Sequence, residues 1–259
     1  MISVIIPCYN SAKTIILVLN SVINQTYKNY EILIVDDGSN DNTKDLVHDF
    51  FKDKHINYKY IYQQNSGPSS ARNNGVQNSS GEYIAFLDSD DEWHFKKLEI
   101  QMKIISEKNL NFLGSTYTYD NLENENIDKI ELRQYSFKKL LFSNKFSTPG
   151  VIIKKSFFKE LVGFDYTMKY AEDYDLWIRA SLKEDLNLII NPKLFRLYKS
   201  AYGDSGLSSH MFSMYKSELY LFKKIKAKKN INILQYTFIG LFVTLKFFRR
   251  QLKNIFRKV

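Results

Sequence analysis

A regular alternation of short apolar runs with helix-patterned segments constrains the fold of this chain most strongly. The apolar runs stand at residues Ile2–Ile6, Glu31–Val35, Tyr58–Tyr62 and Tyr83–Leu87, so they begin 25 to 29 residues apart. Strands separated by helices at this spacing are typical of βαβ units, which build a parallel sheet. We therefore predict that the chain opens with an α/β fold.

Polar side chains follow three of these four runs. The first run ends in Pro7-Cys8-Tyr9-Asn10, the second in Asp36-Asp37-Gly38-Ser39 and the fourth in Asp88-Ser89-Asp90-Asp91. Ligands of open parallel sheets bind beyond the carboxyl ends of the strands. The three segments are therefore predicted to converge on one edge of the sheet.

The segment Asp88-Ser89-Asp90-Asp91 places three carboxylates in four residues. Carboxylates this close repel one another unless a cation or solvent compensates. Mg²⁺ and Mn²⁺ take oxygen ligands, and they usually bind one or two protein carboxylates together with phosphate oxygens and water. The cluster favours a metal and diphosphate site, although an acidic loop before a helix that begins near Phe95 would also explain it.

Composition limits the other classes of structure. A chain of 259 residues with 44% apolar and 15% aromatic residues can bury a large core. Cys8 is the single cysteine, so an internal disulfide is excluded and a reducing compartment is favoured. Residues Met1–Pro7 lack a basic leader and are interpreted as the first strand, not as a signal peptide.

The strand and helix rhythm weakens after about Asn111. We expect a mixed region there, with strands near Phe112–Tyr119 and Gly150–Lys154 and helices near 156–162 and 173–181. Residues 1–210 are predicted to form one unit, in which the strand and helix rhythm covers residues 1–110 and the mixed region residues 111–210. Residues 211–259 are predicted to form a basic amphipathic helical tail.

Charge separates this tail from the rest of the chain. Residues 211–259 contain twelve Lys or Arg and one acid, a net charge of +11, whereas residues 1–210 contain 25 basic and 27 acidic residues, a net charge of −2. A nearly neutral body with a basic tail argues against nucleic-acid binding and for a tail that meets an anionic surface.

An apolar stripe runs along the same tail. Steps of three and four residues place seven apolar side chains on one helix face: Leu234, Phe238, Leu241, Leu245, Phe248, Leu252 and Ile255. Residues 231–245 are too short to span a bilayer, so we expect the helix to lie in the membrane interface. Packing on the body or on a second subunit is the alternative, and an oligomer is possible.

Five motifs in order carry a family resemblance. SVIIPCYN, QTYKNYEILIVDDGSNDNT, NSGPSSARNNG, GEYIAFLDSDDEW and AEDYDLWIR, spread between Ile2 and about Arg179, resemble those of inverting family 2 glycosyltransferases with the GT-A fold. The resemblance implies a Rossmann-like sheet in a nucleotide-sugar-binding part over residues 1–110 and a mixed, acceptor-binding part over residues 111–210. It also implies a nucleotide diphosphate sugar as donor, usually a UDP-sugar. It does not identify the sugar.

The resemblance implies nucleotide contacts at four positions. Pro7 and Tyr9 resemble the residues that frame the base, and Asp37 the carboxylate that accepts a hydrogen bond from the uracil imide. Arg72 resembles a nucleotide contact, because its planar guanidinium suits a base edge or a phosphate.

The resemblance also gives roles to the acidic cluster. Asp88 would face the ribose, Ser89 is a short neutral neighbour in that turn, and Asp90 would be the principal protein ligand of an Mn²⁺ or Mg²⁺ ion that bridges the diphosphate.

The family's general base corresponds here to Asp173, in Glu172-Asp173-Tyr174-Asp175-Leu176-Trp177. The positive end of a helix would lower the pKa of Asp173, and the neighbouring Glu172 would raise it, so the sequence leaves the net effect open. Without the resemblance, Asp173 would be interpreted as a charge that stabilises its own helix. Trp177 and Tyr174 are candidates for an acceptor platform, although such aromatics are more often core residues.

One position departs from the family pattern. Many relatives have Arg-x-His after this helix, and the nearest match here is Arg196-Leu197-Tyr198. Either Tyr198 supplies a phenolic hydrogen bond to the phosphate, or a group in the following loop of residues 199–210, such as His210, replaces the missing His. The glycines of this loop suggest that it could close over the donor.

These observations predict an inverting, metal-dependent glycosyltransferase that adds a sugar to a saccharide or lipid-linked saccharide in cell-surface glycan synthesis. It would be cytoplasmic and peripheral on the inner face of the membrane. A metal-dependent phosphohydrolase of the haloacid dehalogenase type and a non-catalytic nucleotide-sugar-binding scaffold are the alternatives. The former leaves the Asp37 motif unexplained, and the presence of both Asp90 and Asp173 argues against the latter.

Overall fold

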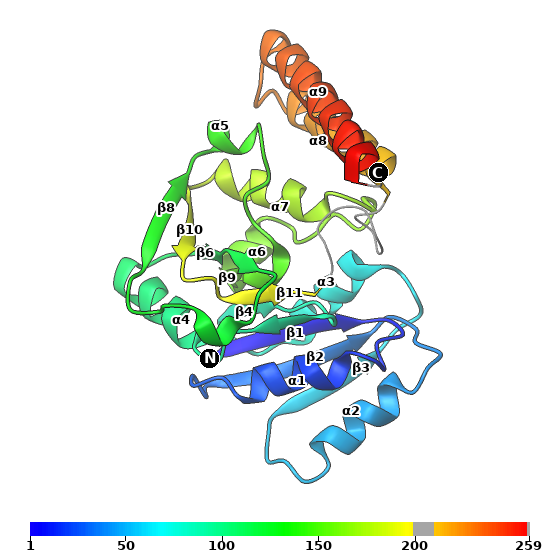
Figure 1. Cartoon of the computed structure of the whole chain (residues 1–259), viewed down its shortest axis with the longest axis vertical. Coiled ribbons are helices and arrows are strands. Elements are labelled where there is room, and N and C mark those ends of the chain that lie inside the picture. The colour runs from blue at the N-terminus through cyan, green and yellow to red at the C-terminus, as the bar shows by residue number, and fades with distance from the viewer. Residues whose placement is uncertain (199–209, 258–259) are drawn as a thin grey trace.

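The chain forms a mixed α/β structure around one large sheet (Figure 1). This computed structural model describes residues 1–198 and 210–257. Within them, eight strands form the sheet in the order β3-β2-β1-β4-β9-β6-β10-β8. The strands are β1 (Ile2–Cys8), β2 (Tyr30–Asp36), β3 (Tyr58–Tyr62), β4 (Tyr83–Phe86), β6 (Phe112–Ser115), β8 (Glu131–Tyr135), β9 (Ile152–Lys154) and β10 (Leu186–Asn191).

The direction of the strands changes along this sheet. β1 is parallel to both β2 and β4, and β2 is parallel to β3, as the 25 to 29 residue rhythm predicts. β9 then runs antiparallel to both of its neighbours, β4 and β6. The predicted combination of a parallel half with a mixed half is therefore confirmed.

Helices cover both faces of the sheet because the strands alternate their side chains between two cores. In β1, Ile5 belongs to one core, while Val4 and Ile6 belong to the other. Three helices of the body contribute to the first core, α3 (Pro68–Asn78), α6 (Lys155–Glu160) and α7 (Glu172–Ser181), and the C-terminal helices described below also contribute to it. Three others supply the second: α1 (Ile15–Ile23), α2 (Thr43–Phe51) and α4 (Lys97–Lys108). Shorter elements are α5 (Phe137–Leu140) and two 3₁₀ turns, η1 (Leu122–Asn124) and η2 (Thr148–Gly150).

The start of α2 is joined to the segment that follows β1. The N-cap residue of α2 is Asn42. The carboxylate of the preceding residue, Asp41, accepts hydrogen bonds from the backbone N–H of Ala12, after β1, and from that of Thr43, the first residue of α2.

A second, three-stranded sheet lies beside the first. It consists of β5 (Asp91–Trp93), β11 (Phe195–Leu197) and β7 (Tyr117–Thr118), in that order. The single strand predicted near Phe112–Tyr119 is thus two strands in different sheets. The chain leaves the large sheet at Thr116, whose N–H donates to Ile189 and whose carbonyl accepts from Leu194.

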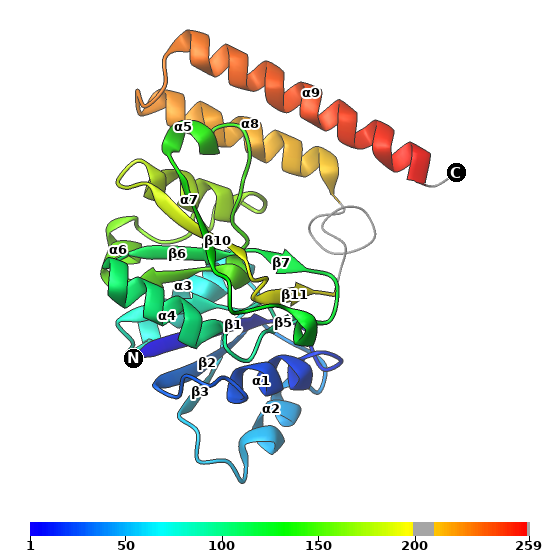
Figure 2. The same cartoon turned by 60° about the vertical axis from the view of Figure 1, so that its left-hand side comes forward.

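Two helices form the C-terminal end of the described chain. α8 (Met211–Ala227) and α9 (Ile233–Arg257) form a hairpin in which α8 lies between α9 and the rest of the molecule (Figures 1 and 2). Leu221, Phe222 and Ile225 of α8 are buried, and so are Ile239 and Val243 of α9. Neither α8 nor α9, nor any other described helix, has the length and apolar content to cross a membrane.

Candidate functional site

The carboxyl ends of β1, β2 and β4 meet at one edge of the large sheet, as predicted. The backbone N–H of Asp37 donates to the carbonyl of Cys8 at 2.8 Å, which joins the ends of β2 and β1. The hydroxyls of Ser11 and Ser89 lie 2.8 Å apart, and the Thr14 hydroxyl donates to the Ser89 carbonyl at 2.5 Å. The acidic turn after β4 is therefore fixed to the segment that follows β1.

The two residues expected to frame a base differ in accessibility. Pro7 is buried inside β1, where it pairs with Val35 of β2. Tyr9 lies just beyond the strand, and its side chain is 50% exposed. Tyr9 therefore has an exposed ring on which a base could stack, whereas Pro7 contributes only its backbone to the edge of the sheet.

Asp37 is buried and held by the segment after β3. Its Oδ1 accepts hydrogen bonds from Gln63 Nε2 at 2.7 Å and from the N–H of Ser66 at 2.8 Å, and its Oδ2 accepts from the N–H of Gly67 at 2.8 Å. Gly67 has a φ of +87°, which an L side chain rarely adopts. A carboxylate has about four acceptor positions, so one position remains for a ligand donor such as an imide.

Arg72 of α3 connects the two halves of the chain. Its Nη2 donates to Asp88 Oδ1 at 2.6 Å, and its Nη1 donates to Glu172 Oε1 at 3.3 Å. Burial lowers the pKa of Arg72, but the two carboxylates outweigh this effect and raise it. The guanidinium is buried and engaged with protein carboxylates, so Arg72 positions Asp88, and its direct contact with a nucleotide stays a prediction.

The acidic turn presents a limited set of metal ligands. Asp88 and Asp90 are half-buried, but Asp88 Oδ1 is bonded to Arg72. Asp91 is buried at the start of β5. Across residues 1–198 and 210–257, no group of three or more His, Cys, Asp or Glu side chains could enclose a metal ion. The donor set fits a hard cation that takes one or two carboxylate ligands and completes its shell with phosphate oxygens and water.

The register of the small sheet places Tyr198 near this turn. β11 runs antiparallel to β5 with Leu197 opposite Asp91, so the next residue, Tyr198, follows on the side of Asp90. The Tyr198 hydroxyl donates to Glu92 Oε2 at 2.6 Å, and the Arg196 guanidinium lies 4.4 Å from the centre of its ring. The residue in place of the family's His therefore lies beside the acidic turn.

Asp173 lies in the first turn of α7, as predicted. Its Oδ1 accepts a hydrogen bond from the N–H of Tyr174 at 2.6 Å, and its Oδ2 accepts from Asn144 Nδ2 at 3.0 Å. Burial raises the pKa of Asp173 and outweighs these bonds, which lower it. The net shift is thus upward, and its largest cause is burial, which the sequence did not indicate.

The neighbouring Glu172 is buried and shifted in the same direction. Burial and the charge of Asp173 raise the pKa of Glu172 to about 7, although the Arg72 guanidinium opposes the shift. The two adjacent carboxyls therefore titrate as a pair.

Two residues of this site were missed by the sequence analysis. Asn144 contacts Asp173 but lies between α5 and η2, in the stretch without a motif, so nothing in the sequence indicated it. Gln63 contacts Asp37 and directly follows β3, the one early strand to whose end we assigned no ligand group. The convergence of strand ends on this edge could have pointed to Gln63.

The acceptor platform is a prediction that the structure corrects. Trp177 is fully buried, with its ring centre 5.1 Å from that of Phe112 and 6.2 Å from that of Phe164. Tyr174 is also buried, and its hydroxyl donates to the Leu140 carbonyl. Trp177 packs toward β6, and Tyr174 packs between α5 and Phe222 of the C-terminal helix α8, so both are core residues and neither can contact an acceptor.

The loop expected to close over the donor lies at residues 199–209, outside the described residues. His210 is described and exposed at the start of α8, and its ring centre lies 6.0 Å from that of Tyr170. Its role at a phosphate stays a prediction.

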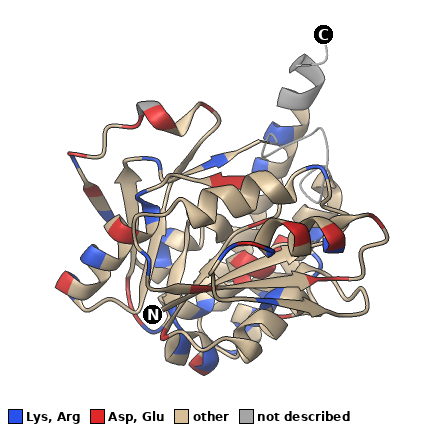
Figure 3. Cartoon of the chain, turned by 90° about the horizontal axis from the view of Figure 1, so that it is seen from below, with Lys and Arg blue, Asp and Glu red and all other residues tan. Residues whose placement is uncertain are grey.

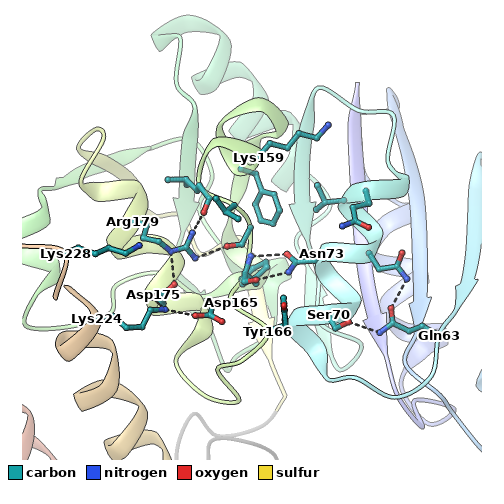
Figure 4. Close-up of a pocket in the computed structure, with 18 residues that line it drawn as sticks. Gln63, Ser70, Asn73, Lys159, Asp165, Tyr166, Asp175, Arg179, Lys224 and Lys228 are labelled. Atoms are coloured by element: carbon teal, nitrogen blue, oxygen red, sulfur yellow. Dashed lines mark hydrogen bonds and ion pairs between the residues drawn. The ribbon is translucent and has the colours of Figure 1, made fainter. Parts of the chain in front are cut away.

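A cavity of about 850 Å³ lies on another face of α3, between this helix, the α6 to α7 connection and α8 (Figure 4). Its lining includes Gln63, Asn73, Asp165, Asp175, Arg179 and Lys224, but none of the five residues Asp37, Arg72, Asp88, Asp90 and Asp173. Lys224 pairs there with Asp165 at 2.6 Å and with Asp175 at 2.9 Å. The candidate site is therefore the strand edge, where the convergent carboxylates lie, and not this cavity.

Comparisons with known proteins agree with the resemblance found in the motifs. A family model described as "Glycosyl transferase family 2" matches residues 3–161. An uncharacterised glycosyltransferase of Rickettsia conorii is 39% identical over 188 residues, which are 71% of this chain and 31% of that protein. The chain spans 26% to 31% of the length of three such Rickettsia proteins.

One relative matches over most of both chains. The Escherichia coli protein "UDP-Glc:alpha-D-GlcNAc-diphosphoundecaprenol beta-1,3-glucosyltransferase WfgD" is 32% identical over 219 residues, which are 84% of this chain and 83% of that protein. Among solved structures, S. aureus TarS in complex with UDP-GlcNAc has a TM-score of 0.72 and 22% identity, and the match covers 97% of this chain and 72% of TarS. This likeness confirms the expected GT-A fold.

Proposed function

The chain belongs to glycosyl transferase family 2, and from this premise we propose that it transfers a sugar, with inversion, from a UDP-sugar to a saccharide or lipid-linked saccharide acceptor. The proposal depends most on one observation, the position of Arg72. Its guanidinium bonds both Asp88 of the acidic turn and Glu172, the neighbour of Asp173. Arg72 thus links the start of α7, which carries the proposed base Asp173, to the acidic turn that would bind the leaving diphosphate.

The donor side of the proposal is supported by the strand edge. Tyr9 offers an exposed ring for a base, and Asp37 keeps an acceptor position beside it. TarS was solved with UDP and with UDP-GlcNAc, and the name of the E. coli relative specifies UDP-glucose. UDP is therefore the nucleotide that we propose for this chain.

Asp173 would act as the general base. Inversion requires an acceptor hydroxyl that attacks the anomeric carbon from the face opposite the leaving group, and a base that takes the hydroxyl proton. Asn144 and the N–H of Tyr174 fix the Asp173 carboxylate, and burial increases its proton affinity. Each effect favours proton transfer from a correctly placed hydroxyl.

Asp90 would be the principal protein ligand of an Mn²⁺ or Mg²⁺ ion, which when bound neutralises charge on the leaving diphosphate. Arg72 keeps the neighbouring Asp88 carboxylate in place. Tyr198 lies beside the same turn and could donate to a phosphate oxygen if its hydroxyl leaves Glu92.

For the acceptor we propose a lipid-linked saccharide used in cell-surface glycan synthesis. The support is the E. coli relative, whose name gives a diphosphoundecaprenol-linked sugar as its acceptor and which matches this chain over most of both lengths. The identity of the sugars stays open, because residues 111–169 contain few of the shared motifs.

The variant Asp173→Asn tests the reaction. With Mn²⁺ or Mg²⁺, the wild-type chain should release UDP from a matching donor only when an acceptor is present, because the base acts on the acceptor hydroxyl. Asp173→Asn should bind UDP with unchanged affinity in calorimetry and lose at least about a thousandfold in transfer rate. Asp185→Asn, an exposed carboxylate elsewhere, is the matched control and should keep full activity.

Three results would contradict this proposal. Transfer at the wild-type rate by Asp173→Asn would remove the base assignment. Phosphate release from an aryl phosphate would favour the phosphohydrolase alternative. UDP-sugar binding without turnover on any acceptor of a broad array would favour a scaffold.

A further inference from the structure

The outer face of α9 carries an apolar ridge that the described part of the chain leaves mostly exposed, although the ring of Phe238 also contacts that of Phe142. Its side chains are between 56% and 76% exposed: Leu234, Phe238, Leu241, Leu245, Phe248 and Leu252. We call these six residues the α9 ridge. They lie within nineteen residues, Leu234 to Leu252, which is about 27 Å of helix for the eighteen steps of 1.5 Å between them. Exposed apolar surfaces of this extent mark interaction sites.

The hairpin turns the ridge away from the body. The opposite face of α9 packs on α8 through Ile239 and Val243, which are buried. Lys246 and Arg250 of α9 pair with Glu218 of α8 at 2.5 and 3.5 Å. α8 lies between α9 and the large sheet, so α9 is the outermost helix at this end of the molecule (Figures 1 and 2).

We propose that the α9 ridge docks the protein on an anionic lipid bilayer, with α9 lying in the plane of the membrane interface. This inference does not rest on the proposed reaction. Apolar side chains on one helix face and basic residues around them bind such a surface because apolar burial and attraction to anionic headgroups add.

Charge favours lipid over a second copy of the chain as the occupant. The sequence of α9 contains five basic residues and no acid, and residues 211–259 have a net charge of +11. Acidic and basic residues are interspersed over the body (Figure 3), whose net charge over residues 1–210 is −2. Two hairpins that met ridge to ridge would bring two charges of +11 together, whereas anionic lipid neutralises them.

Docking in this orientation would also place the site relative to the membrane. Lys224 of α8 pairs with Asp175 of α7, the helix whose first turn carries Asp173. The helix that meets the lipid is thus linked through α8 to the helix that presents the proposed base. A bilayer-bound α9 would hold the site at a fixed height above the headgroups.

Vesicle sedimentation tests the docking without any catalytic readout. The full chain should sediment with vesicles of phosphatidylglycerol and phosphatidylcholine, and much less with phosphatidylcholine alone or at high salt. The triple variant Leu241→Gln, Leu245→Gln and Phe248→Gln keeps the net charge and the helix propensity. It should reduce the partition onto anionic vesicles roughly tenfold or more.

The matched control carries Leu17→Gln, Ile130→Gln and Leu182→Gln, three exposed apolar residues outside the hairpin. It should sediment like the wild type, and circular dichroism should show that both triple variants remain folded. Equal sedimentation of the ridge variant and the wild type would overturn the proposal. A second result would also overturn it: the wild-type chain does not bind anionic vesicles but forms a dimer in sedimentation velocity, and the ridge variant does not form this dimer.

Discussion

At the scale of single residues, the candidate site is organised by a buried chain of charges. Arg72 lies between Asp88 and Glu172, and Glu172 precedes Asp173. Burial raises the pKa of Asp173, and burial together with the charge of Asp173 raises the pKa of Glu172. The arrangement keeps proton affinity high at the position where a base is needed.

Asn144→Ala should weaken this base in a way that pH reveals. The Asn144 amide lowers the pKa of Asp173 by donating to its carboxylate, so the variant should raise this pKa further. A base acts only when deprotonated. The acidic limb of kcat/KM should therefore move to higher pH in the variant, and the plateau should fall roughly tenfold because the carboxylate loses its orientation.

The pH profiles of the wild type and Asn144→Ala, measured at saturating donor, check this prediction. The KM for the donor should be unchanged, and Asn78→Ala, which removes an exposed amide at the end of α3, should leave the profile unchanged. An acidic limb at the same pH in Asn144→Ala and wild type would show that Asn144 does not act through Asp173.

At the scale of elements, the site depends on how closely α3 approaches the sheet. Gly75 of α3 lies against Ile5 of β1 and Val35 of β2, and a Cβ at this position would overlap Ile5 Cγ2. Because Gly75 has no side chain, α3 packs close to the strands. This close packing brings the Arg72 guanidinium within hydrogen-bonding distance of Asp88.

Gly75→Ala should therefore destabilise the protein although alanine favours helices. Overpacking costs about 1 to 3 kcal/mol, and the gain in helix propensity is about 1 kcal/mol, so we expect a net loss of about 1 kcal/mol or more. Gly240→Ala is the matched control, because a Cβ there meets no atom within 4 Å and should stabilise α9 by about 0.5 to 1 kcal/mol. Urea unfolding of both variants measures the difference, and a gain in stability for Gly75→Ala would contradict this packing argument.

The elements also show how far sequence reasoning reaches. The four early strands and the convergence of their ends followed from periodicity, because each element there repeats one local pattern. The change from the large to the small sheet at Thr116 could not be predicted from periodicity, because it depends on hydrogen bonds with Ile189 and Leu194, more than 70 residues away. The contact of Asn144 with Asp173 has the same origin, as do the burial of Trp177 and the pairing of Arg72 with Glu172. Each arises from tertiary packing that no local motif encodes.

At the scale of the whole molecule, an ion-pair network joins the C-terminal hairpin to the body. Lys224 bonds Asp165, which precedes α7, and Asp175, which lies within it, and Arg179 also bonds Asp175 at 2.7 Å. Burial raises the pKa of Asp165, but hydrogen bonds from Lys224 and Thr167 outweigh it and lower the pKa to about 2. The folded state therefore favours the ionised form of Asp165.

Lys224→Met should lower the free energy of unfolding by about 2 kcal/mol at pH 7, because it leaves two partly buried carboxylates without this partner. The stabilisation from Asp165 is present above its ordinary pKa of 3.8 and is lost as the pH falls toward 2. The difference between wild type and variant should therefore shrink between pH 4 and pH 2.

Thermal or urea unfolding at several pH values measures this difference. Lys183→Met breaks an ion pair with Glu160 in which both side chains are more than half exposed, so it should change stability by less than about 0.5 kcal/mol. A Lys224→Met effect as small as that of Lys183→Met would show that the hairpin is held by its apolar contacts alone.

The bridge made by Arg72 has a consequence for recombining these enzymes. If residues 1–110 are grafted onto the second half of a homologue, the hybrid contains the buried guanidinium of Arg72 but not its partner Glu172. If the recipient half has no acid at that place, Arg72 keeps Asp88 but loses one of its two carboxylate partners in the interior. Compatible parents for such hybrids can thus be chosen by checking one side chain on each side of the junction.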